Sequence, residues 1–267
     1  MIKSLFILLF SLLILNSFSQ QLDSINVNKP TLGKIPKIID IQDLVRDGFN
    51  YWNEEFSGHW TGIFVGLNSF ANKDYNIYPD DDSGFLDSDI IKSHTLQLNF
   101  FQYSKGLQTT RNTIGMVTGL GLDIQGYRLD NNTTIEKSND GRIHPRTLVF
   151  ENNQKSKLSS VYLSVPLIFE FQIPIKHYAN RLYFSGGLVG SKRLSTHTKI
   201  KYRVDNQKQK LKTPDCYSIS EYKCSATIRM GYRWVNVFAS YDLIPLFERD
   251  KGPVLFPYTA GICLLQF

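Results

Sequence analysis

The residues best suited to nucleophilic catalysis in this chain are a serine and a histidine two positions apart. Acyl hydrolysis or transfer needs a nucleophile beside a base, most often Ser and His oriented by a third group. Ser195 and His197 are the best such pair in the sequence. Their spacing is common, and the Lys and Thr residues around them suit a solvated strand. We therefore expect no enzyme, with acyl chemistry as the alternative.

Metal and phosphate sites have no clear signature either. The histidines are His59, His94, His144, His177 and His197, and no two of them share metal-ligand spacing. The acidic run from Asp80 to Asp82 invites a calcium site, but the Gly and the bidentate Glu of an EF-hand loop are missing at their required positions. A Gly-rich phosphate cradle is also missing. We predict no cofactor and no metal, and a solvated loop tip at the acidic run.

The composition points to β-structure. A chain of 267 residues is long enough for one barrel or sandwich domain, or for two small domains. Hydrophobic residues are 42% and charged residues 20%, with 14 Tyr, 18 Phe and 18 Gly, a balance rich in strand formers. The net charge is +6, but 30 basic residues face 24 acidic ones without a long basic block, so nucleic acid is not an expected partner.

The first residues predict export. Lys3 provides a positive start, Leu5 to Leu15 form an apolar run, and Ser17-Phe18-Ser19 has the small-x-small pattern of a cleavage site, so residues 1–19 are predicted to be a signal peptide. The run is shorter than the ~20 residues that span a bilayer as a helix. No Cys lies near the cleavage site, which argues against a lipid-anchored lipoprotein. The cysteines, Cys216, Cys224 and Cys263, are odd in number, so a disulfide framework is not expected.

The segment from residue 20 to 57 differs from the rest of the chain. It starts with a polar, Pro-containing linker over 21–36. Apolar residues then recur near a helical period between Ile38 and Trp52, which predicts a short amphipathic helix. We interpret residues 20–57 as a short N-terminal segment ahead of the main domain at 58–267.

From residue 58 onward the hydrophobic period changes from that of a helix to two. Between Thr95 and Phe100, polar and apolar residues alternate strictly, which sends them to opposite faces of a strand. The segments with this character are 58–70, 91–103, 113–128, 158–172, 181–204, 216–230, 234–244 and 254–267. The sequence thus predicts eight strands, an even number.

The connections between these segments alternate in length. Those near 71–90, 129–157, 205–215 and 245–253 are mostly long and polar, whereas 231–234 is a turn. Short turns on one side and long loops on the other are typical of outer-membrane barrels, with the short turns and both termini in the periplasm. The fifth and sixth segments overrun a membrane strand, which predicts a two-stranded extension beyond the outer surface.

Parity along these strands assigns a set of charged and polar side chains to the barrel interior, since a charge on the lipid face would cost ~2 to 4 kcal/mol. They are Asp123, Gln125, Glu170, Arg229 and Asp242. Eight strands leave an interior just wide enough to be filled by side chains, so a porin is not expected. We interpret the charges as a network that plugs the lumen, with an ion or proton path as the alternative. Glu170 and Arg229 are expected to meet.

Aromatic residues are expected to form a girdle at the short-turn end, where amphipathic rings suit the membrane interface. They are Tyr103, Phe171, Tyr183, Tyr232, Trp234 and Phe267.

Several segments resemble a known family. They are GHWTGIFVGLNSF (58–70), LQLNFFQYSKGL (96–107), KSKLSSVYLSVPLIFEFQ (155–172), SGGLVGSKRLSTHTKIKY (185–202) and YDLIPLFERDKGPVLFPYTAGICLLQF (241–267). They look like the small outer-membrane β-barrel family widespread in Bacteroidota, which includes PorT-type proteins. The resemblance implies integration into the outer membrane, with Phe267 as part of the C-terminal signal read by the barrel-assembly machinery. It implies no reaction and no catalytic residue.

These observations lead to one expectation for the fold and three for the function. The fold is an all-β, eight-stranded antiparallel up-and-down transmembrane β-barrel with a short periplasmic N-terminal segment. The expected function is a structural or interaction role in the Gram-negative outer membrane, with lipid around the barrel and a protein partner at the surface loops or the periplasmic end. The alternatives are a lipid-modifying barrel enzyme and a soluble lipocalin-like barrel, whose apolar face would point inward.

Overall fold

The computed structural model describes residues 56–108, 113–131, 133–147, 155–175, 177–204 and 207–266. Contacts divide the chain into Met1–Phe49 and Asn50–Phe267, and all described residues belong to the second unit. The predicted signal peptide, the helix expected between Ile38 and Trp52, and Phe267 lie outside the described residues.

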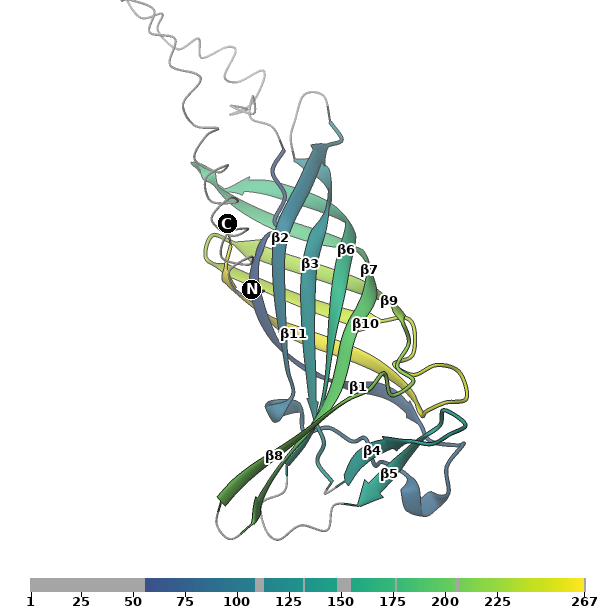
Figure 1. Ribbon diagram of the computed structural model, residues 1–267. Helices are drawn as coiled ribbons and strands as arrows, with labels where there is room; N and C mark the ends of the chain where they lie inside the picture. The colour runs from purple at the N-terminus through teal and green to yellow at the C-terminus, as the bar shows by residue number, and fades with distance from the viewer. Residues whose placement is uncertain are drawn as a thin grey trace, which may run out of the picture. The chain divides into compact units, whose positions relative to one another are not determined.

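Eight antiparallel strands form a ring in which each strand pairs with its neighbours along the chain (Figure 1). They are β1 (Gly62–Asp74), β2 (His94–Gly106), β3 (Ile114–Arg128), β6 (Lys155–Ile175), β7 (His177–Val204), β9 (Tyr222–Tyr232), β10 (Val235–Asp242) and β11 (Val254–Leu265). Pairing of β1 with β11 closes the ring, with Leu67 opposite Ala260. The prediction of an all-β fold with eight antiparallel strands in one sheet is confirmed for the ring, and β4, β5 and β8 are further strands outside it. No helix in the described residues is long and apolar enough to cross a membrane.

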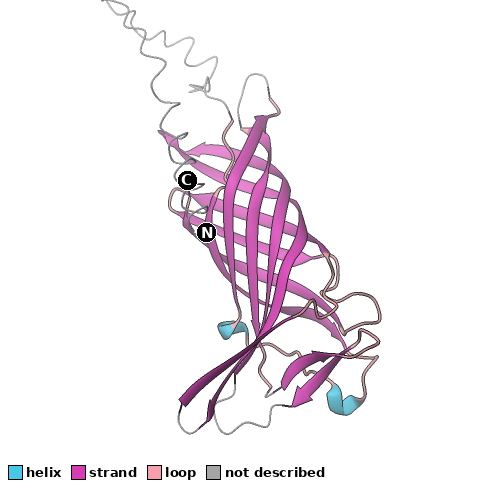
Figure 2. Ribbon diagram, viewed as in Figure 1, coloured by secondary structure: helices cyan, strands magenta, loops and turns pink. Residues whose placement is uncertain are grey.

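The connections differ between the two ends of the ring (Figure 2). The β2–β3, β6–β7 and β9–β10 links lie at the end that also holds the start of β1 and the end of β11, which we call the short-turn end. The other end, the long-loop end, carries all the remaining elements. These are the 3-10 turns η1 (Asp80–Asp82) and η2 (Ile90–Lys92), the β4 (Thr133–Lys137) and β5 (Ile143–Thr147) hairpin, and β8 (Gln207–Pro214).

Several strand boundaries differ from the sequence prediction. β1 begins at Gly62 rather than at 58, because the preceding residues turn into the ring. The extension beyond the ring is built from β6, β7 and β8, with His197–Val204 of β7 pairing along β8. The region 205–215 was expected to be a loop, since Leu211 is the one large apolar residue of QKQKLKTP. Pairing with β7, rather than a hydrophobic pattern, makes it a strand, and β9 starts only at Tyr222.

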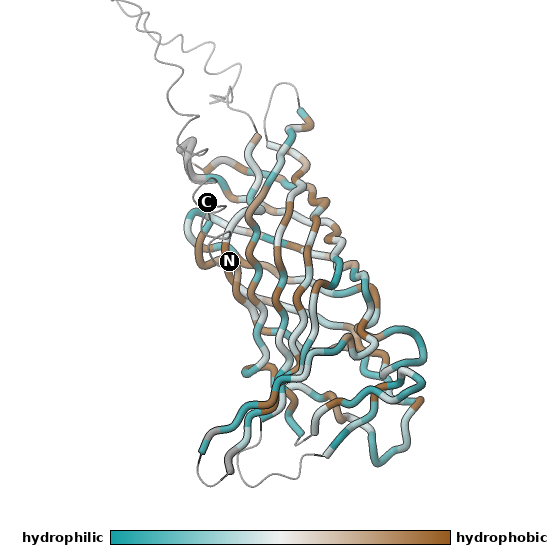
Figure 3. Tube along the Cα trace, viewed as in Figure 1, coloured by the Kyte–Doolittle hydropathy of each residue, from teal (hydrophilic) through white to brown (hydrophobic). Residues whose placement is uncertain are grey.

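Alternation along the strands gives the ring two unlike faces. On β9, Thr227 and Arg229 are buried in the interior, which we call the lumen, whereas Ile228 and Met230 are 66% and 45% exposed. The exposed large apolar side chains of the ring strands are Leu67, Phe100, Phe101, Tyr103, Leu120, Val165, Leu167, Phe169, Phe171, Ile173, Phe184, Leu188, Leu194, Tyr222, Ile228, Met230, Val235, Val254, Ile262, Leu264 and Leu265. Figure 3 shows hydrophobic residues recurring along these strands and hydrophilic residues gathered in the long loops. The outer face is therefore apolar and the lumen largely polar.

The long loops pack together as a cap over the long-loop end. Its buried core, which we call the loop cap, consists of Phe70, Phe85, Leu86, Tyr127, Leu129, Ile135, Ile143, Leu158, Tyr217, Ile219, Leu246, Phe247 and Leu255. Tyr78 packs against this core and donates a hydrogen bond of 2.5 Å to the carbonyl oxygen of Ile143. Burial raises the pKa of the Tyr78 phenol to about 12. The loops thus form an ordered structure with a hydrophobic core of its own.

Candidate functional site

The lumen contains a buried cation held by two carboxylates. The Nζ atom of Lys223, on β9, lies 2.9 Å from Oδ2 of Asp123 on β3 and 3.7 Å from Oδ2 of Asp242 on β10. All three side chains are less than one tenth exposed. The ammonium also lies 4.6 Å from the ring centroid of Tyr162. One ammonium is therefore shared by two carboxylates across the lumen.

Neutral side chains donate further hydrogen bonds to these carboxylates, although Oδ1 of Asp123 and Oδ2 of Asp242 accept none among the described residues. Gln125 donates to Oδ2 of Asp123 over 2.9 Å, and the Tyr127 hydroxyl donates to Gln125 over 2.9 Å. Ser225 donates to Oδ1 of Asp242 over 2.6 Å. The structure thus brings three of the residues assigned to the interior, Asp123, Gln125 and Asp242, into one network. Lys223 at its centre was not recognised from the sequence.

Arg229 lies nearer the short-turn end and is held by aromatic rings rather than by a carboxylate. Its guanidinium carbon is 4.1 Å from the ring centroid of Trp60 and 4.5 Å from that of Phe64. Its Nη2 donates to Gln97 over 3.3 Å, while Nε and Nη1 have no hydrogen-bond partner among the described residues. Arg229 and Asp123 line a lumen cavity of about 20 Å³, which is large enough for one water molecule.

The residues before β1 enter the lumen from the short-turn end. Gln102 of β2 accepts a hydrogen bond from the amide of Trp60 over 2.6 Å, and its own amide group donates to the carbonyl oxygen of Gly58 over 2.9 Å. Gln172 of β6 donates to the carbonyl oxygen of Ser57 over 2.6 Å. Side chains of β2 and β6, the two strands that flank β3, therefore hold the backbone of residues 56–61, which we call the entering segment.

His59 anchors the entering segment to Glu170. Its Nδ1 atom is 2.6 Å from Oε1 of Glu170, and its backbone amide donates to Oε2 over 3.1 Å. The His59 ring also stacks on Tyr183, with centroids 4.1 Å apart. Glu170 is only 1% exposed. An imidazole and an amide thus satisfy a carboxylate that the ring buries.

These contacts correct two expectations. Glu170 and Arg229 were expected to pair, but among the described residues the ion-pair partner of Glu170 is His59. Tyr183 was expected in the aromatic girdle, yet it points into the lumen and is 2% exposed, because it stacks on His59. Tyr103, Phe171 and Trp234 do lie exposed on the outer face or at the turn.

Two glycines make room for the entering segment. Gly62 has a φ of 145°, a conformation that side chains disfavour, and a Cβ there would lie 2.4 Å from the carbonyl oxygen of Leu265. At Gly115 of β3 a Cβ would lie 2.3 Å from the ring of Phe56. The first glycine lets the chain turn from the lumen into β1, and the second leaves space for Phe56.

The other candidates from the sequence do not form an organised site. In the part of the chain that the structure describes, no hydrogen bond links Ser195 to His197, and no cluster of His, Cys, Asp and Glu could hold a metal ion. The acidic run is the exposed turn η1. Cys216, Cys224 and Cys263 are free thiols.

The lumen network is thus the best-organised polar site that the structure describes. Comparison of the chain with family models, with curated proteins and with solved structures found no match.

Proposed function

We propose that the protein is an integral outer-membrane β-barrel with a side-chain-filled lumen, and that it acts as a structural or interaction protein. The proposal rests on the polarity of the two faces of the ring, which is the reverse of that in a soluble barrel. Apolar side chains cover the outside of the ring, while Asp123, Lys223 and Asp242 are buried inside it. A soluble lipocalin-like barrel would need the opposite arrangement, with its apolar residues facing inward.

Hydrocarbon is the solvent that suits this surface. A sheet in lipid has no water to satisfy its edges, and pairing of β1 with β11 removes both edges of the sheet. The segment Val161–Phe171 of β6 shows the expected pattern: Val165, Leu167 and Phe169 face outward while Glu170 faces the lumen.

The filled lumen supports a plug rather than a diffusion pathway. The Lys223 network, Arg229 and the entering segment, whose Trp60 ring stacks on Arg229, together occupy the lumen. Ion pairs, hydrogen bonds and ring contacts hold these charged groups, as expected for buried charges that stabilise a closed interior. We therefore favour the plug over an ion or proton path.

The loop cap is the feature that favours an interaction role. We propose that the long-loop end faces the outside of the cell and the short-turn end faces the periplasm, as in bacterial outer-membrane barrels. Loops held by a common core present one defined surface to a protein partner. A pull-down from crosslinked outer membranes tests this role, and recovery of the chain without any partner would count against it.

The family assignment remains a proposal based on the resemblance of the segments. It places the chain with the small Bacteroidota outer-membrane barrels of PorT type and gives Phe267 a role in barrel assembly. Deleting Phe267 should slow insertion by the assembly machinery without changing the stability of the folded ring.

The central test compares two leucines with similar exposure. Leu167 faces outward in the middle of β6 and is 50% exposed, whereas Leu211 lies on β8 beyond the ring and is 47% exposed. In a membrane, Leu167→Arg should lower the free energy of unfolding by ~2 to 4 kcal/mol, and Leu211→Arg should change it by less than ~1 kcal/mol. Unfolding of the protein in phosphatidylcholine vesicles measures both. Equal small effects, or release of the wild-type protein from membranes by carbonate, would refute membrane integration.

A further inference from the structure

A row of basic residues crosses four neighbouring strands on the outer face, at the long-loop end. Arg128 of β3 lies directly opposite Lys157 of β6, Lys157 opposite Lys199 of β7, and Lys199 opposite Lys212 of β8. Directly opposed residues of an antiparallel pair point to the same face, about 5 Å apart. We call these residues the basic row. Like charges at this spacing destabilise a sheet.

The protein itself does little to neutralise the row. Among the described residues, none of the four forms an ion pair within 4 Å. The acids that act on the row, Asp89 and Asp130, lie beside Arg128 at one end. Lys157 is close enough to Lys199 and Arg128 to be repelled by both. The row therefore carries an unbalanced positive charge.

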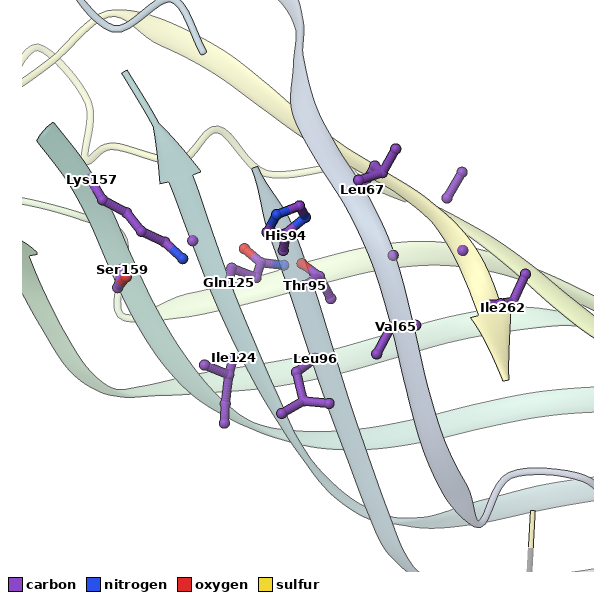
Figure 4. A pocket seen from close by; sticks show the side chains of 14 residues that line it. Val65, Leu67, His94, Thr95, Leu96, Ile124, Gln125, Lys157, Ser159 and Ile262 are labelled. Carbon is purple, nitrogen blue, oxygen red and sulfur yellow. The ribbon is translucent and has the colours of Figure 1, made fainter. Parts of the chain in front are cut away.

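An apolar hollow begins beside the basic row. It has a volume of about 650 Å³ and lies on the outer face of β1, β2, β3 and β11, with His94 and Lys157 at one end (Figure 4). Its apolar lining includes Val65, Leu67, Leu96, Ile124, Ala260 and Ile262. The hollow thus adjoins a cationic group at one end and continues over hydrophobic surface.

Lys157 connects the two features. Its aliphatic stem lies across Gly126 of β3, where a Cβ would come within 2.1 Å of Lys157 Cε. The absence of a side chain at Gly126 therefore lets the stem cover the sheet while the ammonium remains at the head of the hollow.

We propose that the basic row and the hollow form a binding site for a phosphorylated lipid with acyl chains, such as a lipid of the outer leaflet. The phosphate contacts the amines of the row, and an acyl chain occupies the hollow. The inference rests on the proposed membrane function and deepens it by assigning a specific lipid class to one side of the ring. An anion at the row removes the repulsion among its members, and each Lys or Arg near an anionic membrane surface contributes appreciably to binding. A soluble anion would use the row but leave the hollow unexplained.

Lipid retention tests the charged half of the site. The full-length mature protein is reconstituted in phosphatidylcholine vesicles doped with diphosphoryl lipid A, extracted in neutral detergent, and analysed by native mass spectrometry for retained lipid. The double variant Lys157→Gln/Lys199→Gln should retain about 25-fold less lipid A, corresponding to about fivefold per amine. The matched control, Lys105→Gln/Arg233→Gln, removes two exposed basic residues at the short-turn end and should retain as much as wild type. Equal retention of lipid A by wild type, the double variant and the control would refute the proposed phosphate-binding role of the basic row.

A second pair of variants tests the hollow. Ala260→Phe fills the hollow with apolar volume, whereas Ala226→Phe adds the same group to the outer face of β9 away from it. Only Ala260→Phe should reduce retention. Excess inorganic phosphate should displace little of the lipid. Complete displacement by inorganic phosphate, or equal effects of the two Phe variants, would overturn the acyl part of the proposal.

Carbonate extraction of the same vesicles measures insertion into the membrane, which distinguishes failure of the lipid site from failure of the proposed membrane function. If wild type resists carbonate extraction but retains no more diphosphoryl lipid A than a dephosphorylated analogue, the lipid site is wrong and the membrane function stands. If wild type is released by carbonate, both are wrong.

Discussion

Replacing Lys223 with Met should be among the most damaging single changes in the lumen. The Lys223 ammonium is the shared partner of Asp123, at 2.9 Å, and Asp242, at 3.7 Å. Its removal leaves two buried carboxylates without their cation. Breaking a buried pair in this way typically costs about 3 to 5 kcal/mol, and we expect Lys223→Met to lower the free energy of unfolding by that amount.

Because one cation is shared by two carboxylates, the double variant Lys223→Met/Asp123→Asn tests the network more specifically than either single variant. Asp123→Asn alone leaves Lys223 paired with Asp242, so it should cost less than Lys223→Met. In the Lys223→Met background, however, Asp123→Asn removes one of two repelling charges and should restore stability. The same substitution therefore changes sign with the state of residue 223, which a double-mutant cycle measures directly.

Urea unfolding of the detergent-folded protein provides the assay, with the fluorescence of the buried Trp60 as the signal. Lys192→Met is the matched control, because Lys192 is 54% exposed and pairs with Glu221 across 3.5 Å. An exposed pair contributes ~0 to 1 kcal/mol, so the control should unfold close to wild type. A loss below about 1 kcal/mol for Lys223→Met, or the same effect of Asp123→Asn in both backgrounds, would refute the shared-cation interpretation.

Two further predictions concern other residues. His59→Ala and Glu170→Gln should each destabilise the short-turn end, and their effects should be strongly non-additive because the two side chains are in direct contact. Glu170→Gln and Arg229→Met should couple more weakly, since these two residues form no ion pair within 4 Å among the described residues. Additive losses for the first pair would mean that the His59–Glu170 contact does not form in solution. On the extension beyond the ring, burial and then the charges of Lys212, Lys199 and Lys157 lower the pKa of His197 below its ordinary value of 6.5. Because the unfolded chain binds a proton at residue 197 more readily than the folded protein does, the stability contributed by neutral His197 is lost as the pH falls below 6.5. Lys199→Gln should raise the pKa of His197 measured by NMR. An unchanged pKa of His197 would contradict the interaction with Lys199.

The period of two was enough to predict much of the lumen. Asp123, Gln125, Glu170, Arg229 and Asp242 each stand in phase with buried neighbours, and all are buried in the ring. The same signal was present for Lys223, which alternates with Cys224 in step with Thr227 and Arg229. Lys223 lies inside the strand predicted at 216–230, yet it was not among the residues assigned to the interior, although the same alternation places it there.

Pairing across the lumen could not be read from alternation. His59 and Glu170 are 111 residues apart, and which side chain a lumen carboxylate meets depends on strand tilt and on where the entering segment turns. Parity assigns a face to a residue but not a partner. Tyr183 was placed at the correct end of the ring but on the wrong face, although it is in phase with the buried Ser185 and out of phase with the exposed Phe184. Only its stacking with His59 is a long-range contact that alternation does not reveal.

The position of the entering segment also has a consequence for the order of assembly. Residues 56–61 are continuous with β1, and β1 forms the final seam with β11, nearly the whole domain away in sequence. The Gln102 and Gln172 side chains that hold this segment project into a space that becomes enclosed when the seam forms. Contacts of such high sequence separation form late, because the chain between them must first be ordered. In the last step of folding, the entering segment should therefore move into the lumen at the same time as β1 pairs with β11. A chain that lacks residues 56–61 should close the ring around an unfilled interior.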